Sequence, residues 1–208
     1  MRTTTRLIGL AALIAASVSC GAVVRQGSSP VFLVIDLLQG IRGGASAGTP
    51  SNTLFSDVIT NVASPPPCSS NNLCPTIFAD TGTVTLRAPL KASGATATLA
   101  PTTNNEVTIN RIHVEYTRAD GRSTQGVDIP YAFDTAVTGT ILAGGTLSLG
   151  FELVRHVAKE ESPLVQLKTS ANFISSIAKI TIYGVDRVGN QIQVTGSLQI
   201  EFGNFGDF

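Results

Sequence analysis

Histidine and charged residues are scarce in this sequence. Its 208 residues include 2 histidines, His113 and His156, and only 13% of the side chains are charged. His156 has no cysteine or carboxylate partner at metal-ligand spacing, and His113 lies between apolar Ile112 and Val114 on a predicted strand, which turns it towards solvent. A zinc site or a histidine-based catalytic triad would therefore depend on chance. The sequence predicts no metal site and no cofactor.

Clusters of lysine and arginine are also missing. The chain carries 14 basic and 14 acidic side chains, and removal of residues 1–19, predicted below, takes away Arg2 and Arg6 and turns the balance slightly acidic. Proteins that bind nucleic acid need a concentrated patch of positive charge, because phosphate contacts supply most of their affinity. We therefore set nucleic-acid binding aside.

No apolar run in the chain is long enough to cross a membrane. A transmembrane helix needs about 20 predominantly apolar residues, and the N-terminal run at residues 7–16 is much shorter. It follows two basic residues, Arg2 and Arg6, and leads into small residues. This order is typical of a secretory signal peptide.

Cys20 lies where such a signal is cut. Residues 17–20, Ser-Val-Ser-Cys, resemble the lipobox of exported bacterial lipoproteins, with Ser19 at the small position before the cysteine and Ser17 in place of the usual leucine. The resemblance implies that residues 1–19 are a signal peptide and that Cys20 carries lipid. Residues 20–30 would then form a lipid-anchored tether. Ordinary signal cleavage nearby, giving a secreted or periplasmic soluble protein, is the alternative.

The other two of the three cysteines are Cys68 and Cys74. In an exported chain, two cysteines separated by five small or polar residues most simply form a local disulfide. A metal site would need further ligands nearby, and both histidines are distant in sequence. The spacing therefore predicts a disulfide that holds residues 68–74 as a shaped loop.

Alternation of apolar and polar residues predicts β-strands through most of the chain. The clearest case is residues 191–202, where every second residue is apolar or small: Ile192, Val194, Gly196, Leu198, Ile200 and Phe202. Such a strand buries one face and leaves the other in water. Residues 179–202 are predicted as a hairpin about the turn at residues 186–190. Asp186 should bond the local backbone there, as Asp120 should in an earlier turn.

Two other strands carry special signals. Residues 83–90 alternate cleanly, and Pro89, which has no backbone N–H, places this strand at a sheet edge, at least at its end. In residues 106–116 the alternation changes phase, which predicts a β-bulge near Asn110 and Arg111.

Residues 137–142 and 146–154 are expected to pair as a hairpin, and residues 125–129 are expected to return as a strand after an Asp-Gly turn. Residues 155–162 are the one convincing helical candidate, with strand resuming at residues 164–167. In this segment three charged side chains are expected on a solvated face: Lys159, Glu160 and Glu161.

The final hairpin, with the sequence Ile-Tyr-Gly-Val-Asp-Arg-Val-Gly-Asn at residues 182–190, resembles the last two strands of bacterial immunoglobulin-like and fibronectin type III-like domains. The resemblance covers the hairpin alone. Together with the many short strands, it implies an all-β fold for residues 31–208, an antiparallel immunoglobulin-like β-sandwich. The loop at residues 68–74 and a long loop at residues 91–105 would project from it.

No catalytic motif stands out. Residues 145–150 contain Ser148 between glycines, but the spacing differs by one residue from that of a nucleophile elbow, and Ser148 lies within a predicted strand. The carboxylates are scattered singly: Asp36, Asp57, Asp80, Asp120, Asp128, Asp134 and Asp186. A carbohydrate-active enzyme or other hydrolase would need two of them to converge in three dimensions, and calcium at a loop end is a further alternative.

We therefore expect an envelope-anchored, extracytoplasmic lipoprotein that binds or assembles with a partner without catalysis. Its partners would be the membrane, through the lipid, and another envelope protein or a glycan. Loops 68–74 and 91–105 are expected to form the contact surface, since shaped loops on a rigid scaffold are a common binding device. The role of the C-terminal tail, with Phe205 and Phe208, stays open between docking on the domain and contacting something else.

The lipid anchor is directly testable. Mass spectrometry of the mature protein should show a diacylglyceryl modification on Cys20 at the new N-terminus, because the signal and the cysteine position agree. An unmodified N-terminus at any other residue would contradict this prediction.

Overall fold

A computed structural model of the chain describes residues 27–44, 48–91 and 100–206. Nearly all of its regular structure is β, which confirms the predicted all-β class. The strands are β1 (Val34–Ile41), β2 (Thr53–Asp57), β3 (Thr60–Val62), β4 (Cys74–Thr76), β5 (Asp80–Arg87), β6 (Val107–Arg118), β7 (Phe133–Ile141), β8 (Thr146–Val154), β9 (Ile174–Asp186) and β10 (Gln191–Gly203). Three short 3-10 helices are η1 (Thr103–Asn105), η2 (Val157–Lys159) and η3 (Leu164–Thr169). Within these described ranges, no helix is both long and apolar enough to cross a membrane.

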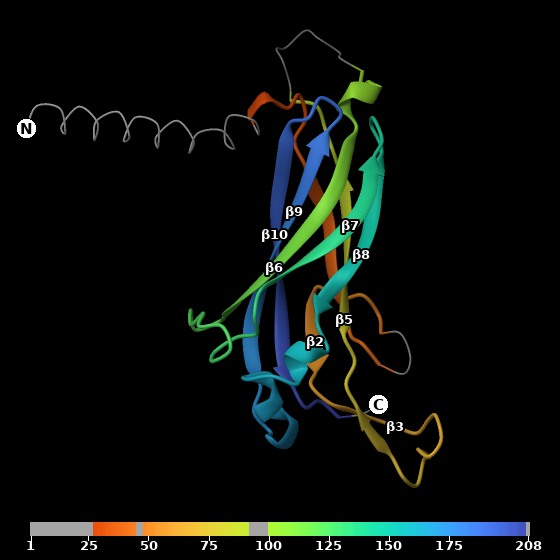
Figure 1. The fold of residues 1–208 in the computed structure, drawn as a ribbon, viewed down its shortest axis with the longest axis vertical. Coiled ribbons are helices and arrows are strands. Elements are labelled where there is room, and N and C mark those ends of the chain that lie inside the picture. Colours follow the sequence, from red (N-terminus) through yellow and green to blue (C-terminus); the bar gives the residue numbers. More distant parts are fainter. Residues whose placement is uncertain (1–26, 45–47, 92–99, 207–208) are drawn as a thin grey trace, which may run out of the picture.

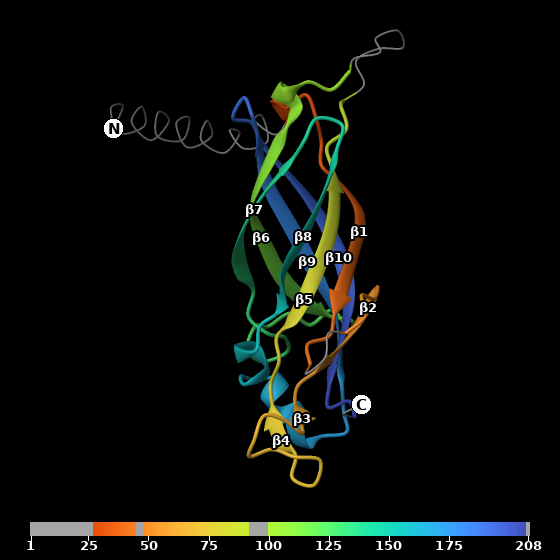
Figure 2. The same ribbon diagram turned by 90° about the vertical axis from the view of Figure 1, so that its right-hand side faces the viewer.

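The strands form two facing sheets and a small arm. A five-stranded sheet has the order β2-β10-β9-β6-β7, and a three-stranded sheet has the order β1-β5-β8. Figures 1 and 2 show them running along the long axis of the domain, with the β3–β4 arm projecting at one end. All pairings in the two sheets are antiparallel except that of β10 with β2, which is parallel. Apolar side chains from both sheets meet in one core.

Strand β10 follows the predicted alternation, and its core face is confirmed. The buried residues on that face are Ile192, Leu198, Ile200 and Phe202. Gly196 occupies a core-facing position opposite β1. A Cβ atom there would lie 2.8 Å from the Ile35 side chain and 3.0 Å from that of Leu38. A larger residue at this position would therefore require the ends of the Ile35 and Leu38 side chains to move.

The bulge in β6 is confirmed. The register with both neighbouring strands shifts between Ile109 and Arg111. Ile109 and Ile112 are both fully buried although they are three positions apart, an offset that would place them on opposite faces of a regular strand. The extra residue resets the phase of the strand, so that its whole apolar set faces the core.

Both predicted aspartate turns are confirmed. Asp186 accepts hydrogen bonds from the backbone of Val188 at 3.0 Å and of Asn190 at 2.8 Å. Burial alone would raise the pKa of Asp186, but bonds from Asn190, Ser29 and Val188 outweigh it and hold that pKa below its ordinary value. In the other turn Asp120 accepts a bond from the backbone of Arg122.

The predicted edge position of residues 83–90 is wrong, since β5 is the central strand of its sheet. Pro89 lies beyond the last residue of β5, so the ladder loses no donor. Its carbonyl still accepts a hydrogen bond from Phe32 at 3.2 Å. The proline thus marks the end of the strand and not the edge of the sheet.

The predicted hairpin of residues 137–142 with 146–154 is also wrong. Strand β7 pairs with β6, whereas β8 pairs with β5, so the turn between them carries the chain from one sheet to the other. Alternation identifies the buried face of each strand but does not distinguish a hydrogen-bonded neighbour from one in the facing sheet. Residues 125–129 form a loop closed by an isolated bridge between Gln125 and Ile129, instead of the expected strand.

The segment that follows β8 differs from its prediction as well. In place of an α-helix over residues 155–162 and a strand over 164–167, the chain forms the 3-10 helices η2 and η3. They lie at the end of the domain that carries the β3–β4 arm (Figure 1). These short helices close the core with three of their own side chains, which are buried: Ala158, Leu164 and Leu167.

The face assignment of β10 gives a stability prediction. Leu198→Asp places an unpaired charge in the core and should cost several kcal/mol, out of a total stability of about 5 to 15 kcal/mol. Ser197→Asp is the matched control, because Ser197 is exposed and lies opposite Lys179 on β9. Thermal melts should show loss of folding for the first variant and little change for the second. Equal melting temperatures would show that the assignment is wrong.

Candidate functional site

The two ends of the domain differ in what they carry. At one end the first described residues join the long loop, where Lys91 donates a backbone hydrogen bond to Pro30 at 2.8 Å. Pro101, near the other end of that loop, lies against Gly144 in the β7–β8 turn. The β3–β4 arm, η2, η3 and the end of β10 lie at the opposite end (Figures 1 and 2). We call this opposite end the distal end.

The two predicted binding loops do not come together. The disulfide between Cys68 and Cys74 is confirmed, with a Cα–Cα distance of 5.5 Å, and it holds the loop of the β3–β4 arm at the distal end. The described ends of the 91–105 loop lie at the other end. Cys20 and Phe208 lie outside the described residues. The described parts of the two loops therefore form no common contact surface.

A buried ion pair lies at the distal end. Lys159 Nζ lies 2.8 Å from Asp80 Oδ2, and both side chains are almost completely inaccessible to solvent. The prediction that Lys159 lies on a solvated face is therefore wrong, whereas Glu160 and Glu161 are exposed as expected. The helix η2 is too short to have a separate wet face, and its last residue turns inward to meet the carboxylate.

Asp80 is fully bonded by the protein. Its Oδ2 also accepts a hydrogen bond from the Ser56 hydroxyl at 2.6 Å, and its Oδ1 accepts one from the backbone N–H of Gly43 at 2.8 Å. These contacts come from β2 and from the segment after β1. A buried carboxylate satisfied on both oxygens supports structure, since it has no free position for a substrate or metal ion.

Asp57 forms a second, partly buried ion pair nearby. Its Oδ2 lies 2.8 Å from Arg42 Nη2, and its Oδ1 accepts a hydrogen bond from the backbone of Phe205 at 3.2 Å. Burial raises the pKa of Asp57 above its ordinary value, although Arg42 and the hydrogen bonds oppose the shift. This carboxylate fixes the start of the C-terminal tail, so Phe205 docks on the domain.

Tyr116 completes the polar structure of the core at this end. Its hydroxyl donates a 2.6 Å hydrogen bond to the carbonyl of Leu153, which ties β6 to β8 in the facing sheet. Burial, with the negative charge of Asp80 nearby, raises the pKa of Tyr116 far above its ordinary value. The phenol therefore stays protonated and acts as a structural donor.

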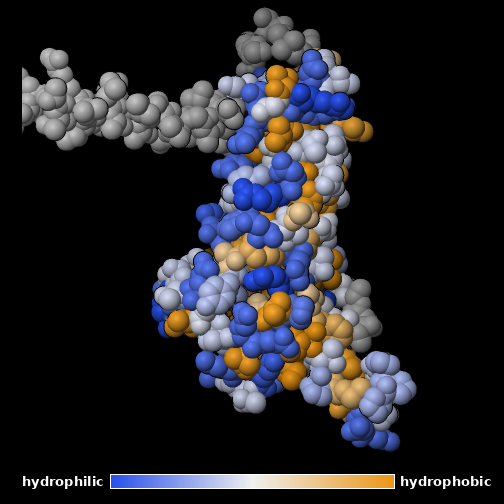
Figure 3. All heavy atoms as spheres, in the orientation of Figure 1, coloured by the Kyte–Doolittle hydropathy of each residue, from blue (hydrophilic) through white to orange (hydrophobic). Residues whose placement is uncertain are grey.

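An exposed aromatic cluster lies on the outer face of the five-stranded sheet at the distal end. We define it as Phe55, Phe173 and Phe205. The rings of Phe55 and Phe205 meet edge to face with centroids 5.6 Å apart, and both Phe205 and Phe173 border Gly203. Phe55 is 54% exposed and Phe173 62%. Figure 3 shows apolar surface, broken by polar side chains, over the lower part of the molecule in this view.

Glu201 lies beside this aromatic cluster, directly opposite Phe55 in the register of β10 with β2. Alternation puts it on the wet face, yet it is only 8% exposed. Its Oε1 accepts hydrogen bonds from Ser175 at 2.8 Å and from Gln199 at 2.6 Å. Its Oε2 is buried and has no hydrogen-bond partner. Sequence reasoning did not single out this residue, because its neighbours on the adjacent strands, Phe55 and Ser175, are far away in the chain.

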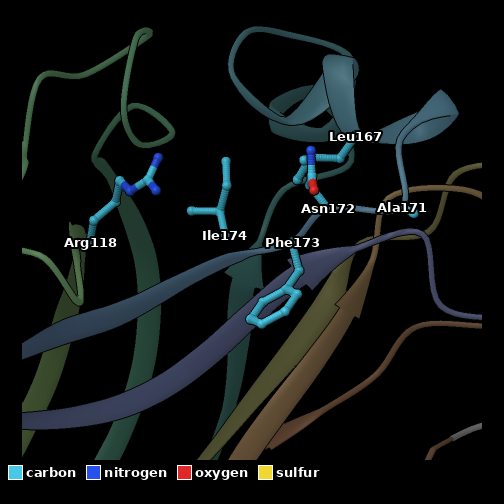
Figure 4. A pocket seen from close by; sticks show the side chains of 6 residues that line it. All are labelled: Arg118, Leu167, Ala171, Asn172, Phe173 and Ile174. Atoms are coloured by element: carbon cyan, nitrogen blue, oxygen red, sulfur yellow. The ribbon is translucent and has the colours of Figure 1, made fainter.

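A pocket of about 420 Å³ opens next to the cluster. It is lined by Arg118, Leu167, Ala171, Asn172, Phe173 and Ile174. Arg118 and Ile174 point towards the same opening, whereas Phe173 points away from it across the strand (Figure 4). Arg118 Nε lies 3.3 Å from the Asp120 carboxylate. The lining residues include no aspartate or glutamate, so this pocket lacks the facing carboxylates that a glycosidase uses.

The other predicted candidates are dispersed over the surface. His113 Nδ1 lies 3.1 Å from Asp134, and Ser148 shares a 3.0 Å hydrogen bond with Thr85 within the three-stranded sheet. Exposed His156 lies just before η2. The remaining surface aspartates pair with arginines: Asp36 with Arg87, Asp120 and Asp128 with Arg122, and Asp134 with Arg111. Over the described residues, no three His, Cys, Asp or Glu side chains gather as metal ligands.

A comparison with known proteins finds no family model, no curated protein and no solved structure that matches this chain.

The buried ion pair gives a second stability prediction. Lys159→Met should lower the free energy of unfolding by about 3 to 5 kcal/mol, because it leaves the Asp80 carboxylate buried without its counter-charge. Adding Asp80→Asn removes that charge, so the double variant should be more stable than Lys159→Met alone. Urea denaturation measures both changes.

Lys168→Met in η3 is the matched control, since Lys168 is a half-exposed lysine outside this pair. If Lys159→Met unfolds at the same urea concentration as Lys168→Met, the ion pair does not hold this end of the domain together.

Proposed function

We propose that the protein is a bacterial envelope lipoprotein, anchored through Cys20 after removal of residues 1–19. Its extracytoplasmic domain is an immunoglobulin-like β-sandwich that binds a protein partner without catalysis. The contact surface is the aromatic cluster at the distal end. Support for the anchor comes from the signal-like N-terminus and the lipobox resemblance. Support for the sandwich comes from two facing layers whose pairings are antiparallel except that of β10 with β2, and from the final β9–β10 hairpin.

The exposed aromatic cluster is the observation that carries this proposal. Phenylalanine side chains bury large apolar areas when a partner covers them, and aromatic residues dominate the energetics of many interfaces. Phe55 and Phe173 are partly exposed on one sheet face, and the Phe55 ring packs against that of Phe205, whose backbone is bonded by Asp57. Together they form a preorganised apolar patch. Patches of this kind on a protein surface mark interaction sites.

The placement of the cluster also suits a tethered protein. It lies at the opposite end of the domain from residue 27, the first residue that the structure describes. A lipid on Cys20 would hold the tethered end near the membrane surface. The aromatic cluster would then face away from that membrane, where a partner in the envelope has access to it.

The polar groups of the distal end support binding over catalysis. Lys159 and Asp80 are bonded to each other inside the core, and Tyr116 donates to a backbone carbonyl. These side chains are buried away from water, as catalytic groups often are. Here their hydrogen bonds link strands and helices of the protein itself.

Capture experiments on envelope extracts test the proposal. The full processed chain should retain a partner that the double variant Phe55→Ser/Phe173→Ser loses, because the variant removes the apolar surface. Phe32→Ser is the matched control, since Phe32 is 44% exposed and lies at the other end of the domain. Equal recovery with all three proteins would remove the aromatic cluster from the proposal.

An enzymatic assay provides the opposite test. Turnover of glycan or ester substrates by the purified protein, abolished by replacing one Asp or Glu, would overturn the non-catalytic function.

A further inference from the structure

Among the described residues, every buried carboxylate but one has hydrogen-bond or ion-pair partners on its buried oxygens. Among the described residues, Asp57, Asp80 and Glu106 each have a lysine or arginine within ion-pair distance. Asp186 is bonded by donors from Val188 and Asn190 instead. Glu201 is the exception, because its Oε2 has no partner. A buried acceptor that lacks a donor carries a desolvation cost, which a suitable donor relieves.

Glu201 and Asp57 offer a direct comparison on one sheet face. In the register of β10 with β2, Glu201 lies opposite Phe55. The next pair on the same outer face of the sheet is Gly203 with Asp57. The chain supplies Arg42 to Asp57 at 2.8 Å. It supplies only neutral donors, Ser175 and Gln199, to Glu201.

The surroundings of Glu201 suit a cation. The faces of aromatic rings attract ammonium and guanidinium groups, and the carboxylate adds a full negative charge. Two such contacts already exist in this domain. The Arg111 guanidinium lies 3.9 Å from the ring centroid of Tyr183, and the Arg155 guanidinium lies 4.6 Å from the ring centroid of Phe133. The rings beside Glu201 have no cation of the chain on them in the described structure.

From this we infer that Glu201 and the aromatic cluster form a receptor for a basic side chain, a lysine or arginine, presented by the protein partner. The inference rests on the proposed function and names the chemistry of its contact. The aliphatic stem of the incoming side chain packs on Phe55 and Phe173, and its charged head donates to Glu201 Oε2. To reach Glu201, the incoming side chain displaces side chains of the aromatic cluster, which are already partly exposed.

The other polar features of the distal end fit this role less well. The carboxylate of Asp80 is saturated by its own chain. The pocket beside Arg118 is lined by no described acid. Of the described acidic residues at the distal end, Glu201 is the one that is buried, has an oxygen without a hydrogen-bond donor, and lies beside exposed aromatic side chains.

A labelled peptide tests the receptor. Fluorescence anisotropy of fluorescein-labelled tri-lysine amide, titrated with the full processed chain in detergent micelles, should show saturable binding. The same peptide with its lysine side chains acetylated should bind about tenfold more weakly, because it has lost the charge-assisted bond. Equal binding of the two peptides would overturn the inference.

Variants locate the contact. Glu201→Gln keeps the shape and an acceptor for Ser175, and should weaken tri-lysine binding about tenfold. Glu115→Gln is the matched control and should leave binding unchanged, since Glu115 belongs to the same sheet face but is already paired with Lys179 at 2.7 Å. Melting temperatures establish that each variant is folded. Unchanged binding by folded Glu201→Gln would contradict the assignment.

The outcomes separate the two proposals. If Phe55→Ser/Phe173→Ser abolishes partner capture while acetylated and free tri-lysine bind alike, the aromatic cluster is the contact surface but it does not recognise a basic side chain. If that variant still captures the partner, the proposed contact surface itself is wrong. A concentration-dependent dimer that Phe55→Ser dissociates would identify a second copy of this chain as the occupant, and would overturn the inference.

Discussion

The distal end of the domain depends on one buried ion pair. Asp80 begins β5 in the three-stranded sheet, and its oxygens take donors from Lys159 in η2, Ser56 in β2 and Gly43 after β1. One carboxylate therefore joins both sheets and the capping helix. The cost of removing two charges from water is offset only because every oxygen is bonded, so the geometry of this end is tightly specified. The helix η2, which supplies Lys159, also packs against η3.

Much of the β architecture could be predicted from the sequence, because it is encoded locally. Alternation gave the buried face of β10, the phase change gave the bulge at Asn110 and Arg111, and cysteine spacing gave the disulfide. Sheet membership could not be predicted in this way. Strands β7 and β8 alternate correctly, yet they belong to different sheets, since a side-chain pattern does not record which backbone accepts the hydrogen bonds.

The candidate site escaped prediction for a related reason. Lys159 is buried and forms an ion pair with Asp80, which is far away in sequence. Glu201 is buried beside the aromatic cluster, whose members come from β2, the residue before β9 and the C-terminal tail. A charged residue is predicted to face solvent, whether in a strand or in a short helix, until its tertiary partners are known. Both residues lie at the distal end of the molecule, where the aromatic cluster also lies.

The order of strands in the five-stranded sheet also bears on how the protein acquires its structure. Strand β10 is the last of the described strands in chain order, yet it lies between β2 and β9 and holds β2 in parallel. During synthesis, β2 therefore has no sheet to join until β10 has emerged. Contacts between segments so far apart in sequence form slowly, because a long loop must close first. A nascent chain of this topology therefore cannot complete its five-stranded sheet until its last described strand has been made.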